Sequence, residues 1–154
     1  MKKLNRILQK GNLMKIFSSV FMLFILSCVS VQPTNEVVGH YEGNAKIIVD
    51  WCNLDSLAFD LTIDDLGNVT GNIGDAIIIQ GKIKANTYGS TKFIIDAKLE
   101  GSIIEKEEIK RESIKIPFDL IDGNIVGGFG TSGSKFGGKE KMILSGSDLV
   151  LIRQ

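Results

Sequence analysis

The chain has 154 residues, 18 basic against 18 acidic side chains, two cysteines and one histidine. This length fits one domain, and hydrophobic and charged fractions of 44% and 23% are ordinary for a globular protein. Composition therefore excludes collagen-like, low-complexity and disulfide-scaffold proteins. A single histidine excludes most zinc sites and most catalytic arrangements built on an imidazole. We expect no catalytic residues, no metal ligands and no cofactor.

The charges are unevenly distributed along the chain. Residues 1–27 contain five basic side chains and no acidic one, so residues 28–154 hold 13 basic and 18 acidic side chains, a net charge near −5. Nucleic-acid binding requires a basic face. The sequence therefore predicts no nucleic-acid partner, and any membrane attachment must use something other than charge.

A short apolar segment follows the basic start. Residues 16–26 read IFSSVFMLFIL, 11 residues without a charge, which is too short for a spanning helix of about 20 residues. The segment fits the apolar region of a secretory signal peptide. We expect a signal peptide over 1–27, with Met14 as the true start; a long basic region beginning at Met1 is the alternative.

The junction after the apolar segment, Ile25-Leu26-Ser27-Cys28, resembles a bacterial lipobox. The resemblance implies cleavage after Ser27, a diacylglyceryl thioether on Cys28 and acylation of the new amino terminus, and two or more acyl chains make a stable anchor. Residues 28–36 then form the lipidated N-terminus and a polar tether, and 37–154 the folded domain. An ordinary secretory signal with an incidental Cys28 is the alternative.

The second cysteine has no other partner in the chain if Cys28 is lipidated. Cys52 follows Trp51, and we expect it to be a small buried apolar residue. A Cys28–Cys52 disulfide, formed in an oxidising compartment, is the alternative.

From residue 37 onward, apolar side chains recur at every second position, as in Leu57, Phe59, Leu61 and Ile63. This period is typical of strands with one apolar face. We predict an all-β domain, an antiparallel up-and-down meander closing into a barrel of eight or nine strands; a β-sandwich is the alternative. The predicted strands lie near 38–50, 57–65, 68–74, 76–85, 91–100, 111–120, 124–130, 139–145 and 148–153.

Turn residues and breakers separate the predicted strands. Asp122-Gly123 predicts a hairpin, and Ser145-Gly146-Ser147 predicts the last one. Pro117 lacks an amide hydrogen, so its strand is expected at an edge or at a bulge.

We interpret 102–112 as a charged hairpin tip, with one or two helical turns as the alternative. Residues 128–133 match G-x-G-x-x-G by letter, but no helix follows, so we interpret them as a flexible hairpin rather than a nucleotide site.

Two stretches resemble known families. Gly39-His40-Tyr41-Glu42-Gly43 resembles the Gly-x-Trp element that opens a lipocalin-like barrel, which implies that Arg153 closes the barrel base against Tyr41. Ser134-Lys135-Phe136-Gly137-Gly138-Lys139, followed by Gly146 and a Leu-rich end, is similar to the small barrel of transferrin-binding and factor H-binding surface lipoproteins. The candidate ligand-binding or barrel-closing residues are Tyr41, Trp51 and Arg153. His40 is expected to be a packing or surface residue.

The sequence as a whole indicates a bacterial envelope lipoprotein, held at the outer membrane or on the periplasmic face through Cys28. We expect its barrel to be a binding or structural module without catalysis, with a protein partner. A lipocalin-like carrier of a small apolar ligand is one alternative, and a secreted enzyme is another.

Overall fold

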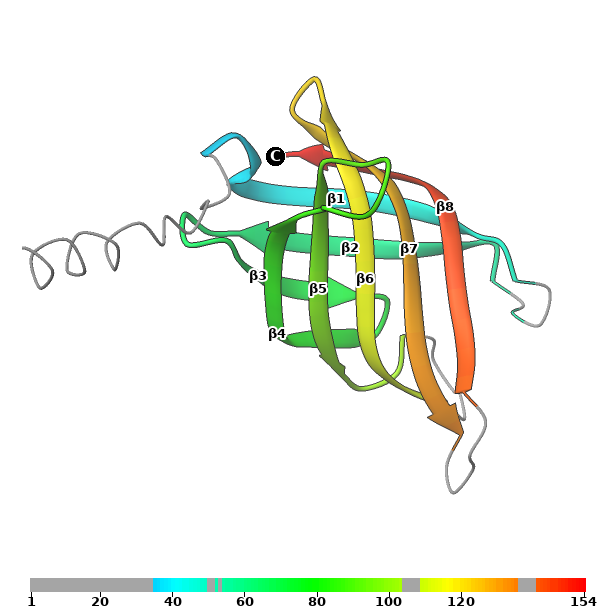
Figure 1. Ribbon diagram of the computed structural model, residues 1–154. Coiled ribbons are helices and arrows are strands. Elements are labelled where there is room, and N and C mark those ends of the chain that lie inside the picture. Colours follow the sequence, from blue (N-terminus) through cyan, green and yellow to red (C-terminus); the bar gives the residue numbers. More distant parts are fainter. Residues whose placement is uncertain (1–34, 50–51, 53, 104–108, 136–140) are drawn as a thin grey trace, which may run out of the picture. The chain divides into compact units, whose positions relative to one another are not determined.

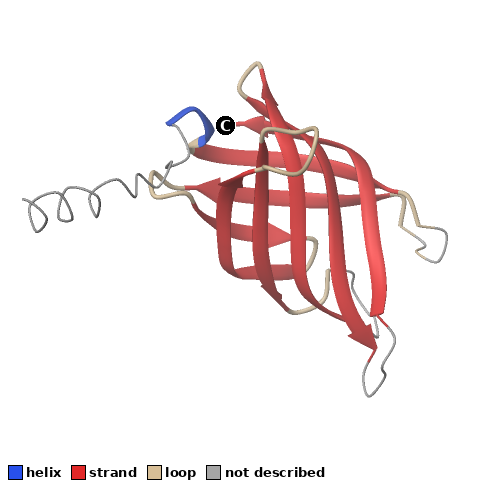
Figure 2. Cartoon of the chain, viewed as in Figure 1, coloured by secondary structure: helices blue, strands red, loops and turns tan. Residues whose placement is uncertain are grey.

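The barrel is described by a computed structural model that covers residues 35–49, 52, 54–103, 109–135 and 141–154. Eight antiparallel strands pair in chain order, and the last pairs with the first to close the barrel (Figures 1 and 2). This confirms the all-β meander and barrel, and excludes the sandwich. A 3-10 helix, η2 (Asn35–Val37), precedes the strands β1 (Gly39–Ile47), β2 (Ser56–Ile63), β3 (Asn68–Ile73), β4 (Ala76–Ala85), β5 (Phe93–Glu100), β6 (Ile109–Ile121), β7 (Asn124–Lys135) and β8 (Lys141–Arg153).

Alternation of side chains produces the hydrophobic core. Along β2, every second residue from Leu57 to Ile63 is buried and the residues between them are exposed. All eight strands contribute inward side chains to a single apolar cluster. Burial of apolar area at about 25 cal/mol per Å² is the main favourable term in such a fold. The largest fully buried side chains are Tyr41, Phe118, Leu61, Ile63, Ile73, Ile95, Ile103, Ile114, Ile116, Ile125 and Leu144.

The ninth predicted strand was wrong. Two strands were predicted over 139–145 and 148–153, but the described residues of both, from Lys141 onward, belong to the single strand β8, so Ser145-Gly146-Ser147 does not form a hairpin. The pairing register of β8 shifts here against both neighbours, and Asp148 has a φ of 52°. A bulge takes up the turn-forming residues without reversing the chain.

The glycine-rich run 128–133 was also misinterpreted, because it lies within β7 and not in a hairpin. Pro117 does not lie at an edge, since β6 pairs with both β5 and β7. The register shift between β6 and β7 falls at Arg111/Ser113 and not at the proline.

Of the segment 102–112, residues 104–108 lie outside the described part of the chain. Its last residues, 109–112, are strand, which overturns the helical alternative there.

The hairpin predicted at Asp122-Gly123 is confirmed. Ile121 pairs with Asn124, and the two residues between them have φ values of 52° and 80°. Positive φ at both central positions is the requirement of the tight hairpin turn that Asp-Gly favours.

We call the ladder between β1 and β8, which closes the barrel, the seam. At one position of the seam the two strands come so close that glycine is required. A Cβ atom on Gly43 would lie 2.0 Å from the carbonyl oxygen of Val150. That oxygen belongs to the β8 backbone, so any side chain at position 43 would have to push the closing strand away. Gly130 in β7 differs, because a Cβ atom there would meet nothing within 4 Å.

We predict that Gly43→Ala lowers the free energy of unfolding by about 1–3 kcal/mol, the usual cost of overpacking. The matched variant Gly130→Ala adds the same methyl group to open space and should change stability by no more than about 0.5 kcal/mol. Urea denaturation followed by circular dichroism measures both. Equal stability of the two variants would show that the seam tolerates a Cβ atom.

Candidate functional site

Two of the predicted barrel-closing residues lie together where β1 meets β8. Tyr41 is opposite Arg153 in the ladder and is fully buried. Its hydroxyl donates a hydrogen bond to the carbonyl oxygen of Val37 over 3.0 Å. The guanidinium of Arg153 donates to the carbonyl oxygen of Val38. The pair therefore fastens the segment that enters β1 to the last strand, and no ligand contact is needed to explain it.

The other predicted positions are less informative. Cys28 and Trp51 lie outside the described residues. Cys52 carries a free thiol, is partly buried and packs against the apolar core. The prediction was a small buried apolar residue, and the observed side chain is less deeply buried than that.

The inside of the barrel is occupied by side chains. Phe59 and Phe129 meet edge to face with ring centroids 5.4 Å apart, and Phe93 stacks on Phe118 at the same distance. One inward polar atom, the Thr131 hydroxyl oxygen, is buried without a hydrogen-bond partner. An eight-stranded barrel either fills with side chains or holds one small ligand; the large apolar side chains buried at the described inward positions favour the first arrangement.

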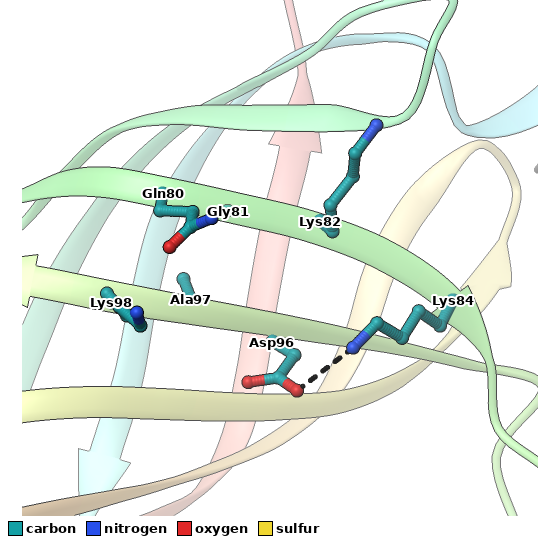
Figure 3. A pocket seen from close by; sticks show the side chains of 7 residues that line it. All are labelled: Gln80, Gly81, Lys82, Lys84, Asp96, Ala97 and Lys98. Carbon is teal, nitrogen blue, oxygen red and sulfur yellow. Dashed lines mark hydrogen bonds and ion pairs between the residues drawn. The ribbon is translucent and has the colours of Figure 1, made fainter.

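A groove of about 310 Å³ lies on the outer face, between β4 and β5 (Figure 3). It follows a register shift in β4 between Ile78 and Gln80. Lysine side chains surround it, and the Lys84 ammonium is 3.2 Å from the Asp96 carboxylate. An apolar interior cavity of similar size would have supported ligand carriage, but this groove is open and polar.

A second outward feature, the His40 cluster, consists of His40, Glu42 and Asp60. His40 and Glu42 are two positions apart on β1 and therefore share a face. Asp60 on β2 is directly opposite Glu42 in the ladder. His40 Nε2 lies 2.8 Å from Asp60 Oδ1 and 3.6 Å from Glu42 Oε1. The three side chains are 41%, 52% and 53% exposed for His40, Asp60 and Glu42.

The sequence predicted His40 to be a packing or surface residue, and it did not reveal this cluster. The alternation at 57–63 placed Asp60 on the outer face of its strand. His40 and Glu42 are two residues apart, so the period of a strand already places them on one common face. The missing information was the β1–β2 register, because the residues joining the strands, 48–55, are too many for turn chemistry to fix it.

A third outward feature, the apolar strip, consists of Ile121, Val126, Val150 and Ile152. Val126 faces Val150 across β7 and β8, and Ile152 follows on the same face of β8. Ile121, Val150 and Ile152 are 53%, 46% and 56% exposed. Apolar side chains grouped on a surface typically mark a contact site.

Comparison with protein-family models, with curated proteins and with solved structures found no match. In the described part of the chain, no helix has the length and apolar character to cross a membrane.

Burial raises the pKa of the Tyr41 hydroxyl above its ordinary value, and the positive charge of Arg153 opposes this in part. The folded state thus favours the protonated phenol. The stabilisation that comes from keeping the Tyr41 phenol protonated is complete below about pH 10, the pKa of an unfolded tyrosine, and is lost as pH rises further.

We predict that Tyr41→Phe lowers the free energy of unfolding at pH 7 by about 1–2 kcal/mol, because the Val37 carbonyl loses its buried donor. Above pH 10 the difference from wild type should shrink, since phenylalanine cannot ionise. Tyr88→Phe is the matched control, because Tyr88 is fully exposed. Denaturant titrations at pH 7 to 11 measure this, and a constant difference across that range would contradict the buried-phenol argument.

Proposed function

We propose that the chain is a bacterial envelope lipoprotein, anchored through lipid on Cys28, whose barrel binds a protein partner on its outer surface. The lipobox-like junction Ile25-Leu26-Ser27-Cys28 after an uncharged apolar segment supports the anchor. Ten residues, 29–38, then separate the anchor from β1, which begins at Gly39. The barrel would stand in water close to the membrane.

The observation that carries the binding role is the packing of large apolar side chains at the inward positions of the barrel. Inward positions are held by large side chains such as Tyr41, Phe118 and Phe59. A small-ligand pocket usually has about 300–1,000 Å³ and buries most of its ligand. Large apolar side chains at the described inward positions favour a surface-binding module over a lipocalin-like carrier.

The apolar strip supports a protein as the partner. Exposed Val150 and Ile152 lie beside the acidic Glu42, which faces Ile152 across the seam. Apolar centres with a polar rim are typical of protein interfaces. The barrel also provides a rigid ladder on which the strip keeps its shape.

A secreted enzyme is supported less well. The His40 cluster does join an imidazole to two carboxylates, but all three side chains are open to water. Catalytic groups act most strongly in preorganised sites that exclude water.

The anchor is tested by the intact mass of protein extracted from membranes with detergent. We predict that the wild-type chain begins at Cys28 and exceeds its polypeptide mass by the mass of the attached lipid. Cys28→Ala should lack the lipid and leave the membrane fraction. A wild-type mass that differs from the variant only by the substitution would remove the anchor.

The partner is tested by photo-crosslinking in intact cells. A photoreactive residue at Ile152 should yield a covalent adduct with an envelope protein on illumination. The matched position is Ile77, which has the same exposure of 56% but lies on β4, away from the strip. Adducts at Ile77 equal to those at Ile152, or none at either, would contradict a partner at the apolar strip.

A further inference from the structure

We propose that the His40 cluster is a surface site for a divalent transition metal ion of the zinc type. The ligands would be Nε2 of His40, a carboxylate oxygen of Glu42 and a carboxylate oxygen of Asp60. One donor atom from each residue lies within 4.8 Å of the other two. The proposal goes beyond the binding of a protein partner and does not depend on the anchor.

The donor set selects the class of ion. Imidazole nitrogen suits zinc, copper and nickel, whereas calcium and magnesium take oxygen ligands alone. Metal–ligand distances near 2.0–2.2 Å in a tetrahedral site put neighbouring ligand atoms roughly 3.3 Å apart. The distances of 2.8 and 3.6 Å from Nε2 to the two carboxylates lie on either side of that spacing. Rotation of exposed side chains is enough to complete the site.

Charge favours a cation at this place. Two carboxylates meet one imidazole, which can compensate at most one negative charge. In the described part of the chain, His40 is the only ion-pair partner of Glu42 and Asp60. The ladder positions beside the cluster are neutral: Thr62 faces His40, Asn72 faces Asp60 and Ile152 faces Glu42. The cluster therefore retains a net negative charge.

The backbone holds the three Cα atoms in place before an ion arrives. His40 and Glu42 lie on one strand, and Asp60 is bound to them through the β1–β2 ladder. Sites built on strands are held more precisely than sites on loops. Three protein ligands on an open face leave room for water or for a ligand atom from a partner, as in open zinc sites.

The single histidine makes the test direct. The full-length chain, purified in mild detergent without a polyhistidine tag, is titrated with Zn²⁺ and followed by calorimetry and by the ¹⁵N NMR signals of its imidazole. We expect one equivalent of Zn²⁺ to bind and to shift the Nε2 signal of His40. Ca²⁺ at the same concentration should leave that signal unchanged.

Variants identify the carboxylates. Asp60→Asn, Glu42→Gln and His40→Gln should each weaken Zn²⁺ binding by at least about tenfold, since loss of even an outer-shell partner commonly costs about 10–100-fold. Asp96→Asn is the matched control, because Asp96 is also a partly exposed carboxylate on the outer face, paired with Lys84. It should leave the affinity unchanged.

Circular dichroism confirms that each variant is folded. The proposal is overturned if Zn²⁺ leaves the imidazole signals in place, if the three ligand variants bind like wild type, or if Asp96→Asn weakens binding as much as Asp60→Asn.

Discussion

The ladder between β1 and β8 is the constraint on which the rest of the molecule depends. Every other strand pair joins neighbours along the chain, whereas this pair joins the two ends of the meander. Gly43 allows the backbones to approach, and Tyr41 and Arg153 fasten the entry segment to the last strand. Without this ladder the sheet would keep two open edges, and its apolar face would have no opposite wall to pack against.

Closure also determines where function can reside. Large apolar side chains occupy the described inward positions, which favours the outer surface as the place for binding and chemistry. The two outward features with the clearest character are neighbours there, since Glu42 of the His40 cluster faces Ile152 of the apolar strip across the seam. A partner seated on the strip would lie beside the proposed metal site, so one face of the barrel can combine apolar contact with metal coordination. The groove between β4 and β5 is separate, and one of its lysines, Lys84, pairs with Asp96.

The sequence was sufficient for the fold class and for most strands. Alternation such as that from Leu57 to Ile63 reports directly which side chains face inward, and Asp122-Gly123 specifies a tight hairpin. It failed at Ser145-Gly146-Ser147, because the residues that form turns also form bulges, and only the pairing of both neighbours distinguishes them. The His40 cluster was missed for a related reason: register between strands joined by a long connection depends on tertiary packing, which local sequence does not encode.

The contact between Arg153 and Val38 joins positions 115 residues apart. Such a distant pairing requires the closure of a long chain loop, and folds dominated by distant pairings are slow to form. A chain cut short before β8 would retain seven strands, and β1 and β7 would each present an unpaired edge that can pair with other copies. Proteolysis or early termination near the end of this protein should therefore yield aggregates rather than a smaller soluble domain.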